Sequence, residues 1–488
     1  MSAANRHCRP VTGMRGAISA AHPLAVSAGI RMLAQGGSAI DAAIAAQAMI
    51  CVTMPQAAGL GGDLLALVST RGTVTAVNGT GRSATQSPAH QATDGGSSVT
   101  VPGLVGGWLT SHRSWGRLPL DEVLSPAIEI AERGYRVDAE LARAVDHQRE
   151  RISRYGAAGW ELLSCRQGGL WNQPELAVLL RRIADSGENA FYTGEAAAEL
   201  VTAVAANGGT LSLADLADHE TEMLSPVETP WNGGRLLVQP PSTQGTLLAM
   251  AARWFDRAGG SAPDNLDHLM IEATEAAFEH RDSVAGPGSL LDVELDVDRE
   301  RALRRGGPRA YLHTAGVAVA DSDGMVVSSL ISVFDDFGSG VYVPELGLVL
   351  NNRVAGFTSG DNAAAPGKKP VHTLAPSMLI DEAGEALALA TPGADGQVQT
   401  LLQVIARMRF SGLGLADALA SPRWRSEDGL LLIERDHSGI PDLTRRSHRL
   451  GLRDSGDDVF GAVVAAGMTN GTPSAAADWR RNVSTGAV

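Results

Sequence analysis

Two neighbouring segments near the amino terminus carry helical patterns of small apolar residues. After Pro23, which suits a first helical turn, apolar residues recur at helical spacing until the glycine pair at 36–37 ends the pattern. Ser38 and Asp41 then have the S-x-x-D spacing of a capping box, and an Ala-rich run continues to about Val52. The sequence therefore predicts two consecutive helices whose small faces can pack closely.

Strand patterns follow these helices and return in the second half of the chain. The continuous apolar run at 64–68 predicts a buried strand, and 74–77 predicts its antiparallel neighbour. Residues 314–321 alternate small and β-branched side chains, and an Asp-Gly turn at 322–324 leads into a second apolar run from Met325. This pattern predicts a β-hairpin.

The rest of the chain mixes helical and strand patterns without an internal repeat. Residues 283–310, rich in Gly, Pro and charge, predict a mobile surface connection. Further strands are predicted near 235–238, 341–350, 376–380 and 387–391. Helices are predicted near 121–133, 138–152, 173–186, 195–206, 213–218, 246–257, 265–281 and 396–409.

The acidic composition narrows the classes of partner. A formal net charge of −14 disfavours non-specific binding to nucleic acid or to anionic lipid, so neither partner is expected. The longest apolar stretch, 39–54, is too short to span a bilayer, and the first ten residues lack the apolar core of a secretory signal. We therefore expect a cytoplasmic globular protein. Its 56 glycines indicate close packing and many tight turns.

Most of the familiar chemical motifs are absent from the sequence. Cys8, Cys51 and Cys165 have no disulfide or zinc-site spacing, and the 12 histidines are scattered without metal-ligand spacing. The glycines at 59–62 lack the Lys-Ser/Thr of a phosphate loop, and Gly-Ser-Gly at 338–340 lacks the spacing of a serine nucleophile elbow. No metal and no cofactor are predicted.

Thr314 is the one candidate nucleophile, and its reactivity would depend on its position in the chain. Taken alone, a threonine at a strand start is an ordinary strand residue. If the chain were cut between His313 and Thr314, the new α-amine, with a reference pKa of about 8, could accept the proton of its own side-chain hydroxyl. Nucleophile and base would then belong to one residue.

Nine short segments together carry a resemblance to a known family. In chain order they resemble segments of the gamma-glutamyltranspeptidase family of N-terminal-nucleophile hydrolases, over nearly the whole chain. The segments are AHPLA (21–25), GGSAIDAA (36–43), GLGG (59–62), VPG (101–103), PPS (240–242), FGSG (337–340), LNN (350–352), APS (375–377) and TPG (391–393).

The resemblance implies a fold and a maturation step. The implied fold is a four-layer αββα sandwich, in which two stacked antiparallel sheets are flanked by helices. The family's precursor cuts itself before a threonine seven residues ahead of a strand-ending aspartate, and Asp321 matches that aspartate. Cleavage of the His313–Thr314 bond would give a large subunit, 1–313, and a small subunit, 314–488, that together form one structural domain.

The catalytic residues implied by the resemblance are mostly kept. Thr314 matches the nucleophile, and Ser332 matches the position whose hydroxyl supports it. Gly393 and Ala394 match the backbone pair of the oxyanion hole. Alanine in place of the second glycine is a mild departure if its φ stays negative, because a backbone donor remains.

The substrate-binding positions depart from the family. Its Asn-Asn pair is followed by Gln or Glu and by an Asp that holds the substrate's α-ammonium, but Arg353 and Gly356 stand at these positions. A guanidinium without that carboxylate disfavours a cationic head group and favours an anionic one. We therefore expect an acyl group that carries a carboxylate but no α-amine held in the usual way.

Other pocket positions have also changed. Phe334 replaces an expected asparagine, and His372 and Thr373 replace the paired serines that grip the α-carboxylate. Arg82 matches the family's carboxylate-binding arginine, although its neighbours differ and a lone arginine is commonly a solvated surface residue.

Three functions follow from the resemblance. The first is a self-cleaving gamma-glutamyltransferase-like hydrolase or acyltransferase with an altered pocket. The second is a relative that acts on a non-glutamyl anionic acyl group, as an oxamate-like or glutaryl amide or at a carbon–carbon bond of secondary metabolism. The third is an inactive scaffold. The expected partners are a small acyl substrate with water or an amine as acceptor, and the subunit pair is compatible with a homo-oligomer.

Overall fold

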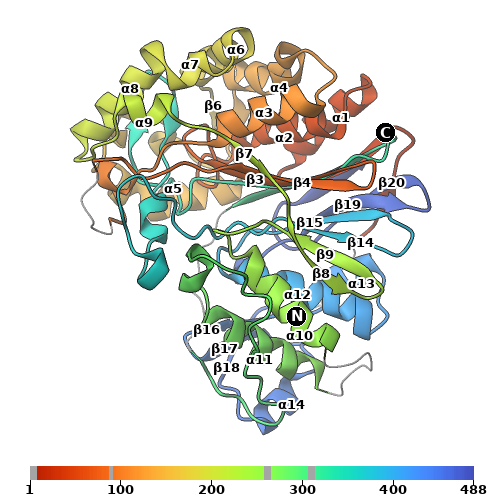
Figure 1. The fold of residues 1–488 in the computed structure, drawn as a ribbon. Coiled ribbons are helices and arrows are strands. Elements are labelled where there is room, and N and C mark those ends of the chain that lie inside the picture. The colour runs from red at the N-terminus through yellow and green to blue at the C-terminus, as the bar shows by residue number, and fades with distance from the viewer. Residues whose placement is uncertain (1–7, 87–91, 258–264, 306–313) are drawn as a thin grey trace.

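Two antiparallel sheets stacked face to face form the centre of the molecule, and helices cover both outer faces (Figure 1). The structure is a computed structural model, and it describes residues 8–86, 92–257, 265–305 and 314–488. The predicted His313 lies outside these ranges. The αββα layering confirms the fold expected from the sequence.

The first sheet has seven strands and contains the predicted hairpin. The return strand β11 pairs with β3 on its other side, so the hairpin lies at the centre of the sheet. In spatial order the strands are β21 (Ser484–Ala487), β2 (Gly16–Ala20), β10 (Ala315–Asp321), β11 (Val326–Ser332), β3 (Asp63–Thr70), β4 (Thr73–Gly79) and β7 (Glu222–Leu224).

The second sheet also has seven strands, drawn from both sides of Thr314 as in the first sheet. In spatial order they are β1 (Val11–Thr12), β20 (Thr472–Ala477), β19 (Val464–Thr469), β15 (Ala386–Ala390), β14 (Ser377–Ile380), β9 (Gly234–Val238) and β8 (Val227–Trp231). Small residues let the sheets approach closely: a Cβ added to Gly316 would lie 2.9 Å from Val464 Cγ2.

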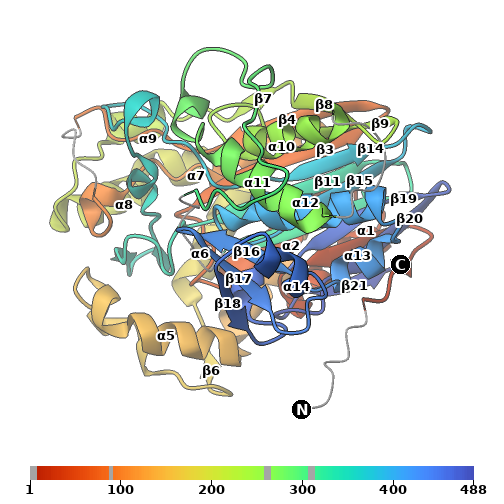
Figure 2. The ribbon, with the colours of Figure 1, turned by 90° about the horizontal axis from the view of Figure 1, so that it is seen from below.

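Helices from different parts of the chain cover the two outer faces. α1 (Pro23–Ala34), α2 (Ala39–Thr53) and α3 (Leu104–Trp115) lie on the first sheet. α10 (Gly245–Arg257), α12 (Gly396–Phe410) and α13 (Leu415–Ala420) lie on the second, beside α11 (Leu266–Phe278), as Figure 2 shows from below. The other helices are α4 (Leu120–Arg133), α5 (Ala139–Ile152), α6 (Pro174–Ser186), α7 (Asn189–Tyr192), α8 (Gly194–Ala206), α9 (Leu213–Ala217) and α14 (Ile440–Arg445).

The helical predictions agree with the structure, and the strand prediction near 341–350 was only partly right. That segment forms two short strands, β12 (Tyr342–Val343) and β13 (Leu348–Val349), which pair with each other around a turn at Gly347. The remaining small sheets are β5 (Tyr135–Arg136) with β6 (Leu170–Trp171), and β16 (Trp424–Glu427) with β17 (Leu430–Glu434) and β18 (Leu450–Arg453). No helix among the described residues is both long and apolar enough to cross a bilayer.

The predicted capping box ties α2 to its surroundings. Ser38 caps α2, and Asp41 Oδ2 accepts hydrogen bonds from the Ser38 backbone and side chain and from two further backbone N–H groups, those of Arg117 and Leu118. Asp41 is fully buried, so its backbone partners satisfy a charge that would otherwise be costly. The sequence motif therefore positions a helix that lies directly on β10 and β11.

Asp321 joins the hairpin turn to the start of α2. Its Oδ2 accepts a hydrogen bond from the Ala39 N–H at 2.9 Å, and its Oδ1 accepts from the N–H groups of Asp323 and Met325, each at 3.0 Å. Asp321 is 1% exposed, so water could not take its place as the acceptor for these three N–H groups. The strand-ending aspartate thus fixes the hairpin that carries Thr314 against the helix layer.

Asp321→Ala should therefore lower the free energy of unfolding by about 3 kcal/mol, since it leaves three buried N–H groups without their acceptor. Urea denaturation measures the change. Asp323→Ala is the matched control, because Asp323 belongs to the same turn but is exposed and pairs with Arg117 at the surface; it should cost less than about 1 kcal/mol. Equal losses in the two variants would contradict this role of Asp321.

Candidate active site

Thr314 lies at the entrance of β10 and contacts the last residue of β11. Its side-chain hydroxyl donates to the Ser332 hydroxyl at 3.3 Å, and both residues are buried. The Phe334 N–H donates to the same Ser332 oxygen at 3.0 Å, which fixes its position. The structure therefore brings together the predicted nucleophile and its supporting serine, which are 18 positions apart in the chain.

Asp63 adds a carboxylate that the sequence analysis did not single out. It is the first residue of β3 and pairs directly with Ser332 in the β3–β11 ladder, so the two side chains lie on the same face of the sheet. Arg353 Nε donates to Asp63 Oδ2 at 3.0 Å, and His372 Nε2 lies 3.3 Å from the same oxygen. A buried ion pair therefore lies beside Ser332, which contacts Thr314.

The charges of this pair follow from its surroundings. Burial raises the pKa of the Asp63 carboxyl, but the hydrogen bond from His372 and the Arg353 guanidinium outweigh burial, so this pKa lies below its ordinary value. Burial, with the nearby Arg353 charge, lowers the pKa of His372 to about 4. His372 Nδ1 accepts a hydrogen bond from the Leu374 N–H, so Nε2 carries the proton and donates it to Asp63.

Phe334 and Arg353 pack against each other beside Asp63. The Arg353 Cζ lies 4.4 Å from the centre of the Phe334 ring, a cation–π contact, and Phe334 has a φ of +84°. A bulky residue in this region of backbone space is strained, and such strain concentrates at functional sites. Arg353 Nη1 also lies 3.5 Å from Thr373 Oγ1. Four of the predicted pocket residues therefore cluster: Phe334, Arg353, His372 and Thr373.

Gly356 ends the short helical turn Arg353–Gly356 and lies against the segment that leads to His372. A Cβ added to Gly356 would meet Pro370 Cβ at 3.4 Å and the Val371 carbonyl at 3.5 Å, which are ordinary contacts. The position therefore has room for a side chain and carries none.

Gly393 and Ala394 follow β15, whose end lies beside the start of β10. A Cβ on Gly316 would lie 3.4 Å from the Ala390 Cβ, so the two strands meet near Thr314. Gly393 has a φ of +122° and Ala394 a φ of +46°. The negative φ that would make alanine a mild departure is therefore not found, and the left-handed conformation costs an alanine about 1 kcal/mol. Among the described residues, none accepts a hydrogen bond from the N–H of Gly393 or Ala394.

Gln244 holds this turn in place and was missed by the sequence analysis. Its Nε2 donates to the Ala394 carbonyl at 2.7 Å and to the Thr373 carbonyl, and its backbone N–H donates to the His372 carbonyl at 2.9 Å. The rigid Pro-Pro-Ser segment just before it was the available signal. Gln244 therefore links the turn at 393–394 to the segment that holds His372 and Thr373.

Arg82 lies at the surface rather than in contact with the buried pair. It donates to the Gly367 carbonyl at 3.2 Å and, with Lys369 and Glu222, lines a surface hollow of about 340 Å³. Lys369 Nζ donates to Glu222 at 3.0 Å, and the Lys369 charge is close enough to His372 to help lower the pKa of that imidazole. Lys369, also missed, therefore connects the hollow to the buried pocket.

One group among the described residues has the composition of a metal site. It consists of His268, Glu272 and His448, from α11 and the segment before β18. The sequence analysis missed it because His268 and His448 are 180 positions apart.

Comparisons with known proteins show the family to which the chain belongs. The family model for gamma-glutamyltranspeptidase matches residues 25–488. The chain is 31% identical over 453 residues to the glutathione hydrolase-like YwrD proenzyme of Bacillus subtilis, covering 85% of this chain and 86% of that protein. It is 32% identical over 442 residues to the oxamate amidohydrolase proenzyme of Klebsiella pneumoniae, covering 83% and 84%.

A solved structure extends the similarity to the whole fold. The crystal structure of cephalosporin acylase from Bacillus halodurans superposes with a TM-score of 0.89 at 28% identity, covering 100% of this chain and 98% of that one. The chain therefore belongs to the gamma-glutamyltranspeptidase family of N-terminal-nucleophile hydrolases and is an enzyme of that hydrolase and acyltransferase type.

Proposed function

We propose that this enzyme cleaves its own His313–Thr314 bond and then uses Thr314 as the nucleophile of an amidohydrolase or acyltransferase. The observation that carries the proposal is the buried Thr314 hydroxyl, hydrogen-bonded to Ser332 at the entrance of β10. The proenzyme names of the relatives support the maturation step. Because both sheets hold strands from 1–313 and 314–488, the two pieces would remain one folded unit after the cut.

The maturation step would use the Thr314 hydroxyl as its nucleophile. The Thr314 oxygen attacks the carbonyl carbon of His313, the C–N bond breaks as the acyl group moves to oxygen, and water then hydrolyses the ester. The products are a carboxylate at His313 and a free α-amine at Thr314. Ser332, which accepts a hydrogen bond from the Thr314 hydroxyl, orients the nucleophile for this attack.

Turnover repeats the same chemistry on a substrate. The α-amine takes the proton of the Thr314 hydroxyl, the oxygen attacks the acyl carbonyl, and the resulting ammonium returns the proton to the leaving amine. The N–H groups of Gly393 and Ala394 would stabilise the oxyanion. Water or an amine then releases the acyl group from Thr314.

The pocket favours an acyl group without an α-ammonium. Gly356 supplies no carboxylate, and the Asp63 carboxylate is already neutralised by the Arg353 guanidinium at 3.0 Å. Arg82 and Lys369 share the surface hollow with four carboxylates, those of Asp215, Asp218, Glu220 and Glu222, so the hollow supplies no excess of positive charge. Because Gly356 leaves an α-ammonium without the usual carboxylate, and because one relative is named an oxamate amidohydrolase, we propose a dicarboxylic-type acyl group, such as glutaryl or oxamate, rather than a γ-glutamyl group.

A pair of substrates that differ in one group tests this specificity. Glutaryl anilide and γ-glutamyl anilide differ only by the α-amine, and we expect kcat/KM to be about tenfold or more higher for the glutaryl compound, corresponding to about 1.4 kcal/mol. Gly356→Asp should shift the ratio toward γ-glutamyl anilide, with Gly356→Ala as the matched control. If γ-glutamyl anilide were the better substrate of the wild type, the proposed specificity would be wrong, and Asp63 Oδ1 would be the partner to consider for the ammonium.

A further inference from the structure

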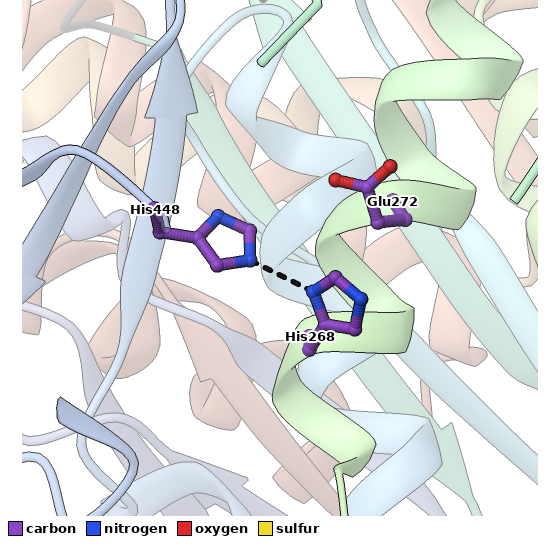
Figure 3. Close-up of side chains that lie close together, drawn as sticks. All are labelled: His268, Glu272 and His448. Carbon is purple, nitrogen blue, oxygen red and sulfur yellow. Dashed lines mark hydrogen bonds between the residues drawn. The ribbon is translucent and has the colours of Figure 1, made fainter. Parts of the chain in front are cut away.

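Two histidines and a glutamate converge between α11 and the segment that precedes β18 (Figure 3). His268 and Glu272 are one turn apart on the same face of α11, and His448 approaches them from the other side. His268 and Glu272 are fully buried and His448 is 9% exposed. One ligand atom from each residue lies within 4.8 Å of the others.

The hydrogen bonds of the two imidazoles determine which nitrogens carry protons. His268 Nε2 lies 3.0 Å from the Asp298 carbonyl oxygen, which can only accept, so Nε2 carries the proton and Nδ1 has a lone pair. That lone pair faces His448 Nε2 at 2.8 Å. A neutral imidazole whose outer N–H donates to a backbone carbonyl is the usual arrangement of a metal-binding histidine.

The segment 298–305 holds the cluster from outside. Besides the Asp298 carbonyl, the Leu303 N–H donates to Glu272 Oε1 at 3.1 Å, and Arg305 Nη1 donates to Glu272 Oε2 at 3.1 Å. The sequence predicted a mobile connection here, but this described part of it is anchored on α11. His268 and Glu272 therefore have outer partners that orient them, as metal-binding side chains require.

We propose that His268, Glu272 and His448 bind a Zn²⁺ ion that links α11 to the chain segment around His448. Two imidazoles and one carboxylate are a common zinc ligand set, with water as the fourth ligand. Zn–N distances of about 2.1 Å place tetrahedral ligand atoms about 3.4 Å apart, so the two rings must separate by only about 0.6 Å. His448 would carry its proton on Nδ1 in the bound form, and no proton need be released.

Three arginines lie near the cluster, Arg304, Arg305 and Arg446, and carboxylates pair with two of them: Arg446 Nε donates to Asp442 at 3.0 Å. Arg305 contacts Glu272, but it also pairs with Glu279 at 3.2 Å and Asp296 at 2.9 Å, so its guanidinium is neutralised without Glu272. The ion would join a helix on the amino-terminal side of Thr314 to a residue on the carboxyl-terminal side. This site is independent of the proposed acyl chemistry and would hold the two pieces together after a cut between them.

Zinc titration of the full-length protein, after dialysis against a chelator, tests the proposal. We expect one Zn²⁺ per chain by competition with a chromogenic chelator, and a visible Co²⁺ spectrum of the tetrahedral type after substitution. His268→Ala and His448→Ala should weaken binding at least 100-fold, and Glu272→Gln about tenfold. His147→Ala, at an exposed position on α5, is the matched control and should bind as the wild type does.

A fold defect is separated from a lost ligand by two further measurements. Thermal melting of each variant without metal shows whether it is folded, and His448→Gln replaces His448→Ala if the alanine variant unfolds. The Co²⁺ spectrum of the wild type tests the site without any substitution, so a fold defect in a variant cannot affect it. If the wild type bound no stoichiometric metal, or if the His268 and His448 variants bound zinc as tightly as the wild type does, the proposal would be overturned and a neutral histidine pair would remain.

Discussion

Thr314→Ala should leave the protein as one 488-residue chain and reduce amidase activity on the order of 10³-fold or more. The variant lacks the oxygen that would attack the His313 carbonyl, so neither self-cleavage nor the acyl-enzyme can form. A denaturing gel shows the first effect: the wild type should give two bands, for 1–313 and 314–488, and the variant one. Initial rates with glutaryl anilide measure the second.

Thr314→Ser is the matched control, because it keeps the hydroxyl and removes only a methyl group. It should still be cut and should keep measurable activity. Since the substitution removes only a hydroxyl and a methyl group just before β10, the alanine variant should also fold, and a cooperative thermal melt would show this. A wild-type protein that remains a single chain, or an alanine variant that is still cut, would remove Thr314 from the mechanism and favour the scaffold.

Asp63→Ala should destabilise the protein by about 3–5 kcal/mol, because it leaves the buried Arg353 guanidinium without its carboxylate. The side chains of the pair are at most 1% exposed, so water cannot replace Asp63. Urea denaturation of the variant and the wild type measures the loss. Activity should fall as well, since Asp63 lies opposite Ser332 in the sheet.

Two further variants show whether the loss of the ion pair causes the lower stability of Asp63→Ala. The double variant Asp63→Ala with Arg353→Met contains no buried charge at this position and should recover much of the stability lost in Asp63→Ala. Glu228→Ala breaks the exposed pair with Arg235 on the second sheet and should cost less than about 1 kcal/mol. If the double variant were as unstable as Asp63→Ala, lost packing rather than an unpaired charge would be the reason.

The Asp63–Arg353 pair also changes the interpretation of the pocket. The sequence indicated an unopposed guanidinium at Arg353, and that expectation was incomplete, because Asp63 lies 290 positions earlier and neutralises it. Lys369 and Arg82 do not replace it as a source of positive charge, because four carboxylates line the same surface hollow. The proposal of a dicarboxylic acyl group therefore rests on the missing carboxylate at Gly356 rather than on an excess of positive charge.

Residues that act through local patterns could be predicted from the sequence. The capping box at Ser38 and Asp41 and the hairpin turn before Met325 depend on neighbours within four positions, and both are found as expected. Thr314 and Ser332 could be placed together because a hairpin brings them together whatever surrounds it. The family motifs extended the prediction to Gly393 and Ala394. No motif could indicate that Ala394 has a positive φ, of +46°.

By itself, the sequence determined the alternation of helices and strands, the hairpin with its threonine and the identity of the family, because periodicity and motifs are properties of short segments. Only the tertiary structure decided which side chains share a buried space: Asp63 with Arg353 and His372, Gln244 with the turn at Ala394, and His268 with His448. These contacts join residues 150–309 positions apart, and their energies depend on burial and on the fold that removes water from them.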